Sequence, residues 1–145
     1  MPAHALRDRY DAELRARGFS ADSAQVAAVE RLDKLHRSLV RAAQQDTSTA
    51  RRLLNRLTSR GAAAKPRRGV YLWGGVGRGK TWLMDLFFHS LPFEQKRRSH
   101  FHRFMHDVHA DLQQHRDTPD PLALVAARIA GRARVLSFDE IFVTD

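Results

Sequence analysis

The sequence predicts an α/β fold behind a helical N-terminal segment, and three features carry this prediction. A short apolar run over residues 69–73 ends abruptly in two glycines, as a buried strand does when it enters a tight turn. The residues that follow, 79–91, are apolar nearly all round, which predicts a buried helix closed by Pro92. A second apolar run, 135–138, delivers two acids at its end, where open α/β sheets place ligand-binding groups.

The N-terminal part of the chain has a helical pattern. It extends over residues 6–60 and is interrupted by Gly18 and by the polar cluster 46–49, which predicts three helices. The second helix has the clearest start, because Ser20 or Asp22 can cap its free backbone N–H groups. Apolar residues then recur at spacings of three and four: Val26, Val29, Leu32, Leu35 and Leu39.

A linker separates the helices from the α/β unit. Residues 61–68 contain three alanines, a lysine and a proline without any apolar period. We therefore expect two domains, a helical segment over 1–62 and the α/β core over 63–145.

Three further elements are predicted between the two apolar strands. Residues 99–104 are a strand candidate, and 105–115 continue as a helix. Asp120 before Pro121 is typical of a helix start, with a capping oxygen followed by proline at the first helical position, and Gly131 marks the expected stop.

The composition of the chain excludes several classes of protein. With 145 residues and 43% hydrophobic content, the chain can bury the core of one ordinary domain. No run approaches the ~20 apolar residues of a membrane-spanning helix, and the absence of cysteine excludes disulfides and Cys-ligated metals. Acids among the arginines of the first twenty residues argue against a secretory signal or transit peptide, so we expect a cytoplasmic protein.

The formal net charge of +9 comes mostly from arginine. Arginines such as Arg31, Arg37 and Arg41 alternate with apolar residues at helical spacing, which indicates solvated helix faces. Nucleic acid is therefore not the expected partner, although a basic surface has affinity for polyanions.

One segment fits a phosphate-binding motif at every fixed position. It matches G-x-x-x-x-G-K-[ST] between a predicted strand and a predicted helix, the context that this motif requires. A merely structural glycine turn would give no reason for Lys followed by Thr. The predicted nucleotide-binding residues are Gly74, Gly75, Val76, Gly77, Arg78, Gly79, Lys80 and Thr81.

The residue types of this loop suit a triphosphate. Glycines allow positive φ angles and close backbone approach, while N–H groups at a helix N-terminus supply partial positive charge. The Lys80 ammonium is expected to reach the β- and γ-phosphates as a catalytic group, and the Thr81 hydroxyl to ligate Mg²⁺. ATP and Mg²⁺ are the cofactors predicted.

The acids that end the second strand complete this chemistry. Asp139 is expected to hold Mg²⁺ through its water shell, and Glu140 to orient the water that attacks the γ-phosphate. Apolar runs followed by two acids are common, so Asp139 and Glu140 indicate this chemistry only because the phosphate-binding motif precedes them. The predicted reaction is phosphoryl transfer to water.

Four histidines form another cluster: His100, His102, His106 and His109. A metal site is one interpretation, since imidazole is a common ligand. The first pair would share a strand face and the second a helix turn, yet no cysteine completes a tetrahedral set. Packing or hydrogen bonding in the sheet is the preferred interpretation.

Three stretches of this sequence resemble the ZapE family of AFG1-like AAA+ ATPases: GVYLWGGVGRGKTWLMDLFF (69–88), SHFHRFMHDVH (99–109) and VLSFDEIFVTD (135–145). The resemblance implies a cytoplasmic ATPase that acts in cell division through the FtsZ ring and assembles as a homo-oligomer. By the same resemblance, Asp139 is the Mg-site residue, Glu140 the catalytic glutamate, and Trp82 structural.

The resemblance also implies a three-layer αβα P-loop core, here truncated after the Asp-Glu strand (Walker B). The family's sheet order is 5-1-4-3-2, so the strand over 69–73 would lack both neighbours, and turnover of ATP is expected to be impaired. The alternative function is a non-catalytic module that binds nucleotide, or whose basic helices bind a protein partner or nucleic acid.

Overall fold

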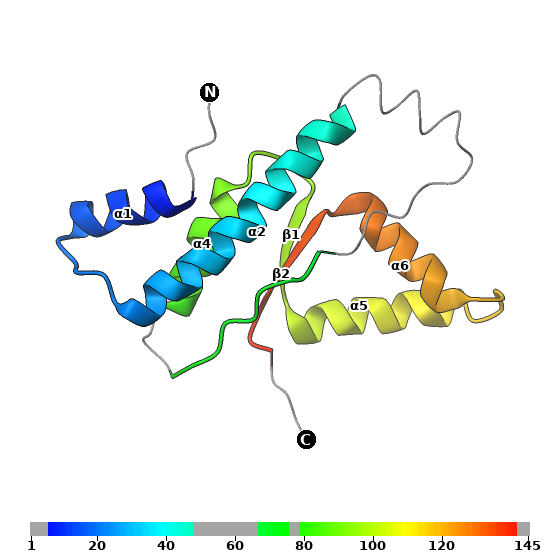
Figure 1. The fold of residues 1–145 in the computed structure, drawn as a ribbon. Coiled ribbons are helices and arrows are strands. Elements are labelled where there is room, and N and C mark those ends of the chain that lie inside the picture. Colours follow the sequence, from blue (N-terminus) through cyan, green and yellow to red (C-terminus); the bar gives the residue numbers. More distant parts are fainter. Residues whose placement is uncertain (1–5, 48–66, 76–78, 142–145) are drawn as a thin grey trace. The chain divides into compact units, whose positions relative to one another are not determined.

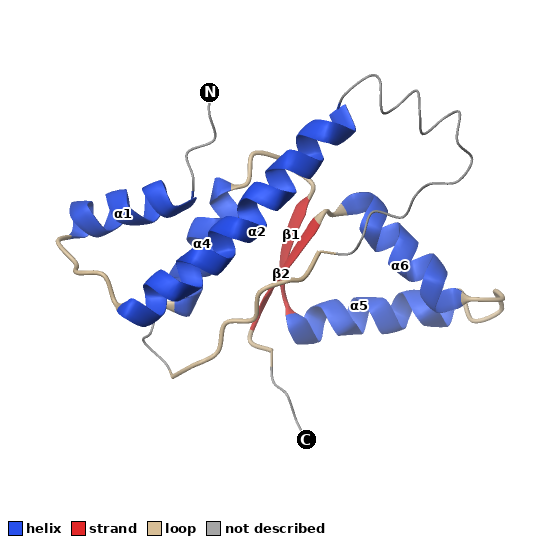
Figure 2. Cartoon of the chain, viewed as in Figure 1, coloured by secondary structure: helices blue, strands red, loops and turns tan. Residues whose placement is uncertain are grey.

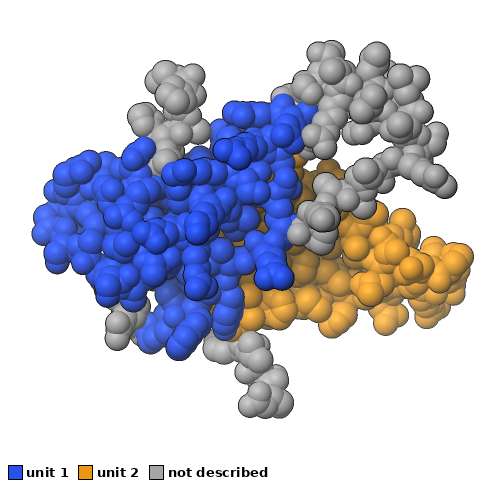
Figure 3. Space-filling model, in the orientation of Figure 1, with its two compact units in different colours: residues 1–92 blue, residues 93–145 orange. Residues whose placement is uncertain are grey.

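The computed structural model describes residues 6–47, 67–75 and 79–141 (Figure 1). Its helices and strands (Figure 2) follow one another in the order α1 (Leu6–Arg17), α2 (Ser23–Thr47), α4 (Lys80–Ser90), β1 (Lys96–His100), α5 (Phe101–Gln114), α6 (Pro121–Arg132) and β2 (Val135–Asp139). The chain divides into two compact units, Met1–Pro92 and Phe93–Asp145 (Figure 3). The domain boundary predicted between 62 and 63 lies outside the described residues, as does the third predicted N-terminal helix.

The helix ends of the first unit follow local chemistry. Gly18 ends α1 with a φ of 66°, which glycine adopts without a steric penalty. The Phe19 N–H then donates to the Leu14 carbonyl at 3.0 Å. At the start of α2, the Asp22 carboxylate accepts a hydrogen bond from the Ala24 N–H at 3.0 Å. Of the two capping residues predicted from the sequence, Ser20 and Asp22, it is therefore Asp22 that caps the helix.

Helices α1, α2 and α4 pack together in the first unit, where α2 and α4 lie side by side (Figure 1). His36 of α2 is buried and its Nε2 lies 3.1 Å from the Ser90 carbonyl oxygen at the end of α4. The helix that follows the glycine loop is thus fixed by the N-terminal helices. The buried apolar side chains are Leu6, Tyr10, Leu14, Val29, Leu32, Leu39, Val40, Leu83, Leu86, Phe87 and Leu91.

The strand predicted over residues 69–73 is wrong. The structure gives these residues no ladder pairing, and the sheet of the described part of the chain has two strands, both in the second unit. Tyr71 and Trp73 are 59% and 82% exposed. An apolar run becomes a strand only where another strand satisfies its N–H and C=O groups, and none of the described strands pairs with this one.

In the second unit, β1 and β2 form a parallel pair in which Lys96 lies opposite Val135 and His100 opposite Asp139. The predicted strand over 99–104 is displaced, because helix α5 already begins at Phe101. Phe101 and Phe104 lie one turn apart in α5, with ring centroids 5.6 and 4.7 Å from Phe138. These aromatic residues belong to the helix, and charged residues form the strand.

The start of α6 agrees with the prediction, since the Asp120 carboxylate accepts from the Ala123 N–H at 3.0 Å. The helix ends at Arg132, one residue past the glycine expected to stop it. An ion pair between Arg128 of α6 and Asp111 of α5, 3.2 Å apart, joins the two helices. No described helix combines the length and apolar character that a bilayer crossing requires.

Candidate nucleotide site

The glycine loop has left-handed backbone at two of its described positions. Gly74 has a φ of 141° and Gly79 a φ of 76°. Gly79 precedes α4, and a Cβ built there would lie 2.9 Å from Nε2 of Gln25. The left-handed conformation therefore favours glycine at Gly79, whereas the flexible Gln25 side chain can move away from a Cβ. Val76, Gly77 and Arg78 lie outside the described residues.

Lys80, the first residue of α4, closes over the beginning of the loop. Its ammonium donates to the carbonyl oxygens of Gly74 and Gly75, each at 2.6 Å. The positive charge thus lies on the loop backbone beside the N-terminus of α4, where unpaired N–H groups attract anions. Thr81 is the next residue and is exposed, which leaves its hydroxyl accessible. These groups fit a phosphate and a hard cation bound to it.

Side chains of helix α1 contact the start of α4. The Trp82 indole N–H donates to Oε2 of Glu13 at 2.9 Å, and its ring lies 5.5 Å from that of Tyr10. The Arg17 guanidinium lies over the Trp82 ring, 5.5 Å from its centroid. Trp82 is therefore a structural residue, as the resemblance implied. Sequence reasoning missed Tyr10 and Glu13; their spacing of three on one helix face was the available signal.

Asp139, the last residue of β2, is held by an arginine of β1. Arg98 Nε donates to Oδ2 at 2.8 Å and Nη2 to Oδ1 at 3.2 Å, a bidentate ion pair. Both side chains are mostly buried, at 25% and 21% exposure. Sequence reasoning missed Arg98, because a basic residue in a run of three gives no sign of its partner.

Glu140 is the one non-glycine residue of the described chain with positive φ, at 54°. This conformation costs a side chain with a Cβ about 1–2 kcal/mol. Its carboxylate is exposed, and Oε2 lies 4.0 Å from Nδ1 of His100. Strained backbone of this kind is typical of functional positions, which makes Glu140 a good candidate for one.

The histidine cluster takes a different form from the one predicted. His100 ends β1 while His102 lies in α5, so the pair shares no strand face; their rings stack with centroids 5.8 Å apart. His106 and His109 do lie one turn apart in α5. All four are exposed, which makes packing inside the sheet the wrong interpretation. Among the residues described, no group of three or more candidate ligands could hold a metal.

The predicted site residues therefore fall into two groups. Gly74, Gly75, Gly79 and Lys80 come together in the first unit, and Asp139 and Glu140 in the second. Thr81 follows Lys80 in α4.

A Gly-Lys-Thr loop at the start of a helix and an Asp-Glu pair at the end of a parallel strand are the features of P-loop ATPases. Residues 4–145 match the model of the AFG1-like ATPase family. The chain belongs to this family, which confirms the resemblance and places it among the P-loop AAA+ proteins, and the structure adds mixed helices and strands with a small parallel sheet.

Relatives match over part of their length. The cell division protein ZapE of Escherichia coli K12 is 44% identical over 128 residues, which cover 86% of this chain and 34% of that protein. Lactation elevated protein 1 homolog B of Danio rerio is 37% identical over 91 residues, covering 55% of this chain and 18% of that protein. The chain thus spans about a third of the E. coli relative's length. No solved structure matches.

Proposed function

We propose that this chain binds ATP with Mg²⁺ and hydrolyses it as part of an AAA+ ATPase. The observation that supports this most directly is the Lys80 ammonium, held at 2.6 Å by the carbonyls of Gly74 and Gly75 at the start of α4. A lysine held there is poised to exchange loop carbonyls for phosphate oxygens. The fold proposed for the whole enzyme is the three-layer αβα core, of which the β1–β2 pair is one part.

The loop binds and orients the triphosphate. Residues 74–81 surround the phosphates with backbone N–H groups, while the N-terminus of α4 and Lys80 attract the negative charge that grows in the transition state. Glycine at Gly79 lets the backbone enter the helix with left-handed φ and without a clash against Gln25. Core packing of α4 and the Trp82–Glu13 hydrogen bond keep this arrangement in place.

The strand end supplies the acids. Thr81 and Asp139 offer the oxygen ligands that Mg²⁺ prefers, and Mg²⁺ when bound would neutralise charge on the β- and γ-phosphates. Glu140 is exposed beyond Asp139 and is proposed to orient the attacking water by accepting its hydrogen bond.

Binding is tested with a fluorescent ATP analogue and Mg²⁺. Lys80→Ala should weaken binding at least about tenfold, because a charge-assisted contact to phosphate is lost. Arg31→Ala, which removes one exposed positive charge from α2, is the control and should bind as the parent does. Equal affinity in the parent and Lys80→Ala would contradict the proposed site.

Hydrolysis is tested by phosphate release. Glu140→Gln keeps the shape of the side chain and removes its charge, so it should retain nucleotide binding and lose any phosphate release by more than about tenfold. Unchanged turnover in Glu140→Gln would remove this residue from the catalytic role.

The family also suggests a cellular role. We propose a cytoplasmic ATPase that assembles as a homo-oligomer and acts in cell division on the FtsZ ring, in keeping with the name of the E. coli relative. Co-sedimentation with FtsZ polymers in the presence of Mg·ATP tests the partner. Sedimentation that is independent of FtsZ polymers would contradict it.

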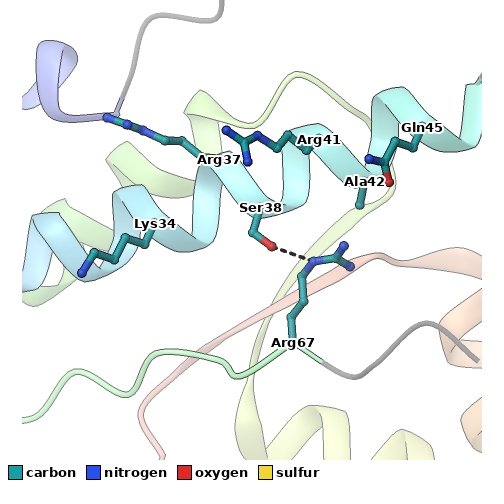
Figure 4. Close-up of a pocket in the computed structure, with 7 residues that line it drawn as sticks. All are labelled: Lys34, Arg37, Ser38, Arg41, Ala42, Gln45 and Arg67. Carbon is teal, nitrogen blue, oxygen red and sulfur yellow. Dashed lines mark hydrogen bonds between the residues drawn. The ribbon is translucent and has the colours of Figure 1, made fainter.

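A basic groove supports the second candidate function, an interaction module that binds nucleic acid. The groove, of about 390 Å³, lies along α2, and no acid is among the described residues that line it (Figure 4). Arg67 reaches it from the chain segment before the loop, and its Nε donates to Oγ of Ser38 at 2.7 Å. The lining residues are Lys34, Arg37, Ser38, Arg41, Ala42, Gln45 and Arg67.

Fluorescence anisotropy with a DNA oligonucleotide at several salt concentrations separates this function from the ATPase. If the groove binds phosphates, the Lys34→Ala/Arg41→Ala variant should lower the salt slope by about 2, one for each lost contact. Arg103→Ala on α5 is the control. No DNA binding at low salt would remove this candidate.

A further inference from the structure

The pairing of Arg98 with Asp139 affects how a metal reaches the strand end. The two residues lie on the adjacent strands β1 and β2, and the guanidinium meets the carboxylate side-on, with one N–H donated to each oxygen. Arg97, the neighbour of Arg98 in β1, instead pairs with Asp107 of α5 at 2.9 Å on an exposed surface. Two adjacent arginines of one strand thus serve different acids.

Two consequences follow from the bidentate geometry. An ionised carboxylate has about four lone-pair sites. The two N–H groups of the Arg98 guanidinium occupy one site on each oxygen, and this fixes the plane of the carboxylate. The guanidinium charge also offsets the carboxylate charge, so that Asp139 attracts an approaching divalent cation less strongly than an unpaired carboxylate would. Asp139 alone is then a poor site for free Mg²⁺.

A nucleotide changes this balance. The phosphates of Mg·ATP bring more negative charge than the metal brings positive charge, so Arg98 does not repel the complex as it repels the free ion. The remaining lone pairs of Asp139, held in a fixed plane, stay available to the water shell of the metal.

We infer that Arg98 is a positioning residue that orients Asp139 and keeps free divalent metal from the strand end, so that metal enters only together with nucleotide phosphates. This role rests on the proposed function, because it assumes that Asp139 serves a metal–nucleotide complex.

The probe is Mn²⁺ without nucleotide, followed by the electron paramagnetic resonance signal of the free ion. Arg98→Gln removes the positive charge, so its Mn²⁺ affinity should exceed that of the parent by roughly three- to tenfold. Arg97→Gln removes an equal charge from the adjacent residue and should stay within about twofold of the parent, since exposed charges are well screened. Equal affinities in Arg98→Gln and Arg97→Gln would overturn the inference.

Further variants keep the test decisive. Adding Asp139→Asn to Arg98→Gln should abolish the gain, which shows that the new affinity belongs to this carboxylate. Arg98→Lys keeps the positive charge and should stay within about twofold of the parent, and Arg98→Met, which also removes the charge, replaces Arg98→Gln if circular dichroism shows that the latter is unfolded. Arg98→Lys with the same affinity as Arg98→Gln would also overturn the inference.

Failure of the inference differs from failure of the proposed function. If the parent binds Mg·ATP while Arg98→Gln leaves Mn²⁺ binding unchanged, only the role of Arg98 is wrong. If the parent binds no Mg·ATP, the proposed function itself is wrong, whatever the metal data show.

Discussion

The two units hold their parts of the candidate site by different forces. In the first unit, α4 is fixed by buried apolar side chains from three helices and by the hydrogen bond from Trp82 to Glu13. In the second, the buried side chains among the described residues are Val125, Val135 and Ser137, and Asp139 is held by a bidentate ion pair. The glycine loop thus depends on hydrophobic packing, whereas the acid pair depends on charge and on two short strands.

Truncating a buried side chain should give the largest difference in stability between the two units. Phe87→Ala in α4, at 4% exposure, should lower the free energy of unfolding by about 3–5 kcal/mol. Val125→Ala in α6, at 1% exposure, should cost roughly 1–3 kcal/mol because less apolar surface is lost. Urea denaturation followed by circular dichroism measures both. Equal losses would show that the two cores contribute alike.

A glycine exchange tests the loop. Gly79→Ala should destabilise by about 1–2 kcal/mol, because alanine at positive φ is strained and its Cβ meets Gln25. The matched control is Gly131→Ala in α6, where no atom lies within 4 Å of the new Cβ. This control should stabilise by about 0.5–1 kcal/mol, since alanine favours the helix. Urea midpoints that move in the same direction would contradict this assignment.

The backbone of Glu140 gives a smaller effect in the second unit. Glu140→Gly relieves the left-handed strain and Glu140→Ala does not, while both remove the carboxylate. The glycine variant should therefore be more stable than the alanine variant by about 1 kcal/mol, after the entropy of the unfolded glycine is counted. Thermal unfolding of the pair is the measurement. An alanine variant as stable as the glycine variant would show no strain.

The smallest effect concerns Tyr10. Burial raises the pKa of its phenol above the ordinary value, and Asp11 and Asp22 add to this, while Arg7 opposes it. A raised pKa means that the folded state favours the neutral phenol, so its contribution to stability is full at neutral pH and is lost as pH rises beyond about 10. Tyr10→Phe should flatten the decline of the urea midpoint in alkali, whereas Tyr71→Phe, at an exposed position, should leave it unchanged.

Local signals predicted much of the fold. The Asp22 and Asp120 caps and the helix after the loop could be read from the sequence because each depends on neighbouring residues. Residues 69–73 were misassigned because a strand depends on a partner distant in sequence. Strand β1 was displaced because its residues are mostly charged, and their pairing with β2 carries no local signal.

For the candidate site, the sequence predicted residue types, and these stay a prediction, but it predicted none of the contacts that the structure shows around them. The loop glycines and Lys80 follow from a motif whose spacing reflects phosphate geometry, and the structure gives them the expected helix start. The Arg98 partner of Asp139 and the strained backbone of Glu140 depend on tertiary structure, which no spacing in the sequence encodes.

Calorimetric titration of ATP, with and without Mg²⁺, tests most directly whether the loop and the acid pair serve one metal–nucleotide complex. In the parent, Mg²⁺ should raise the ATP affinity, and in Asp139→Asn this gain should shrink at least about threefold while the affinity without metal stays the same. A gain of the same size in Asp139→Asn and in the parent would contradict a shared site.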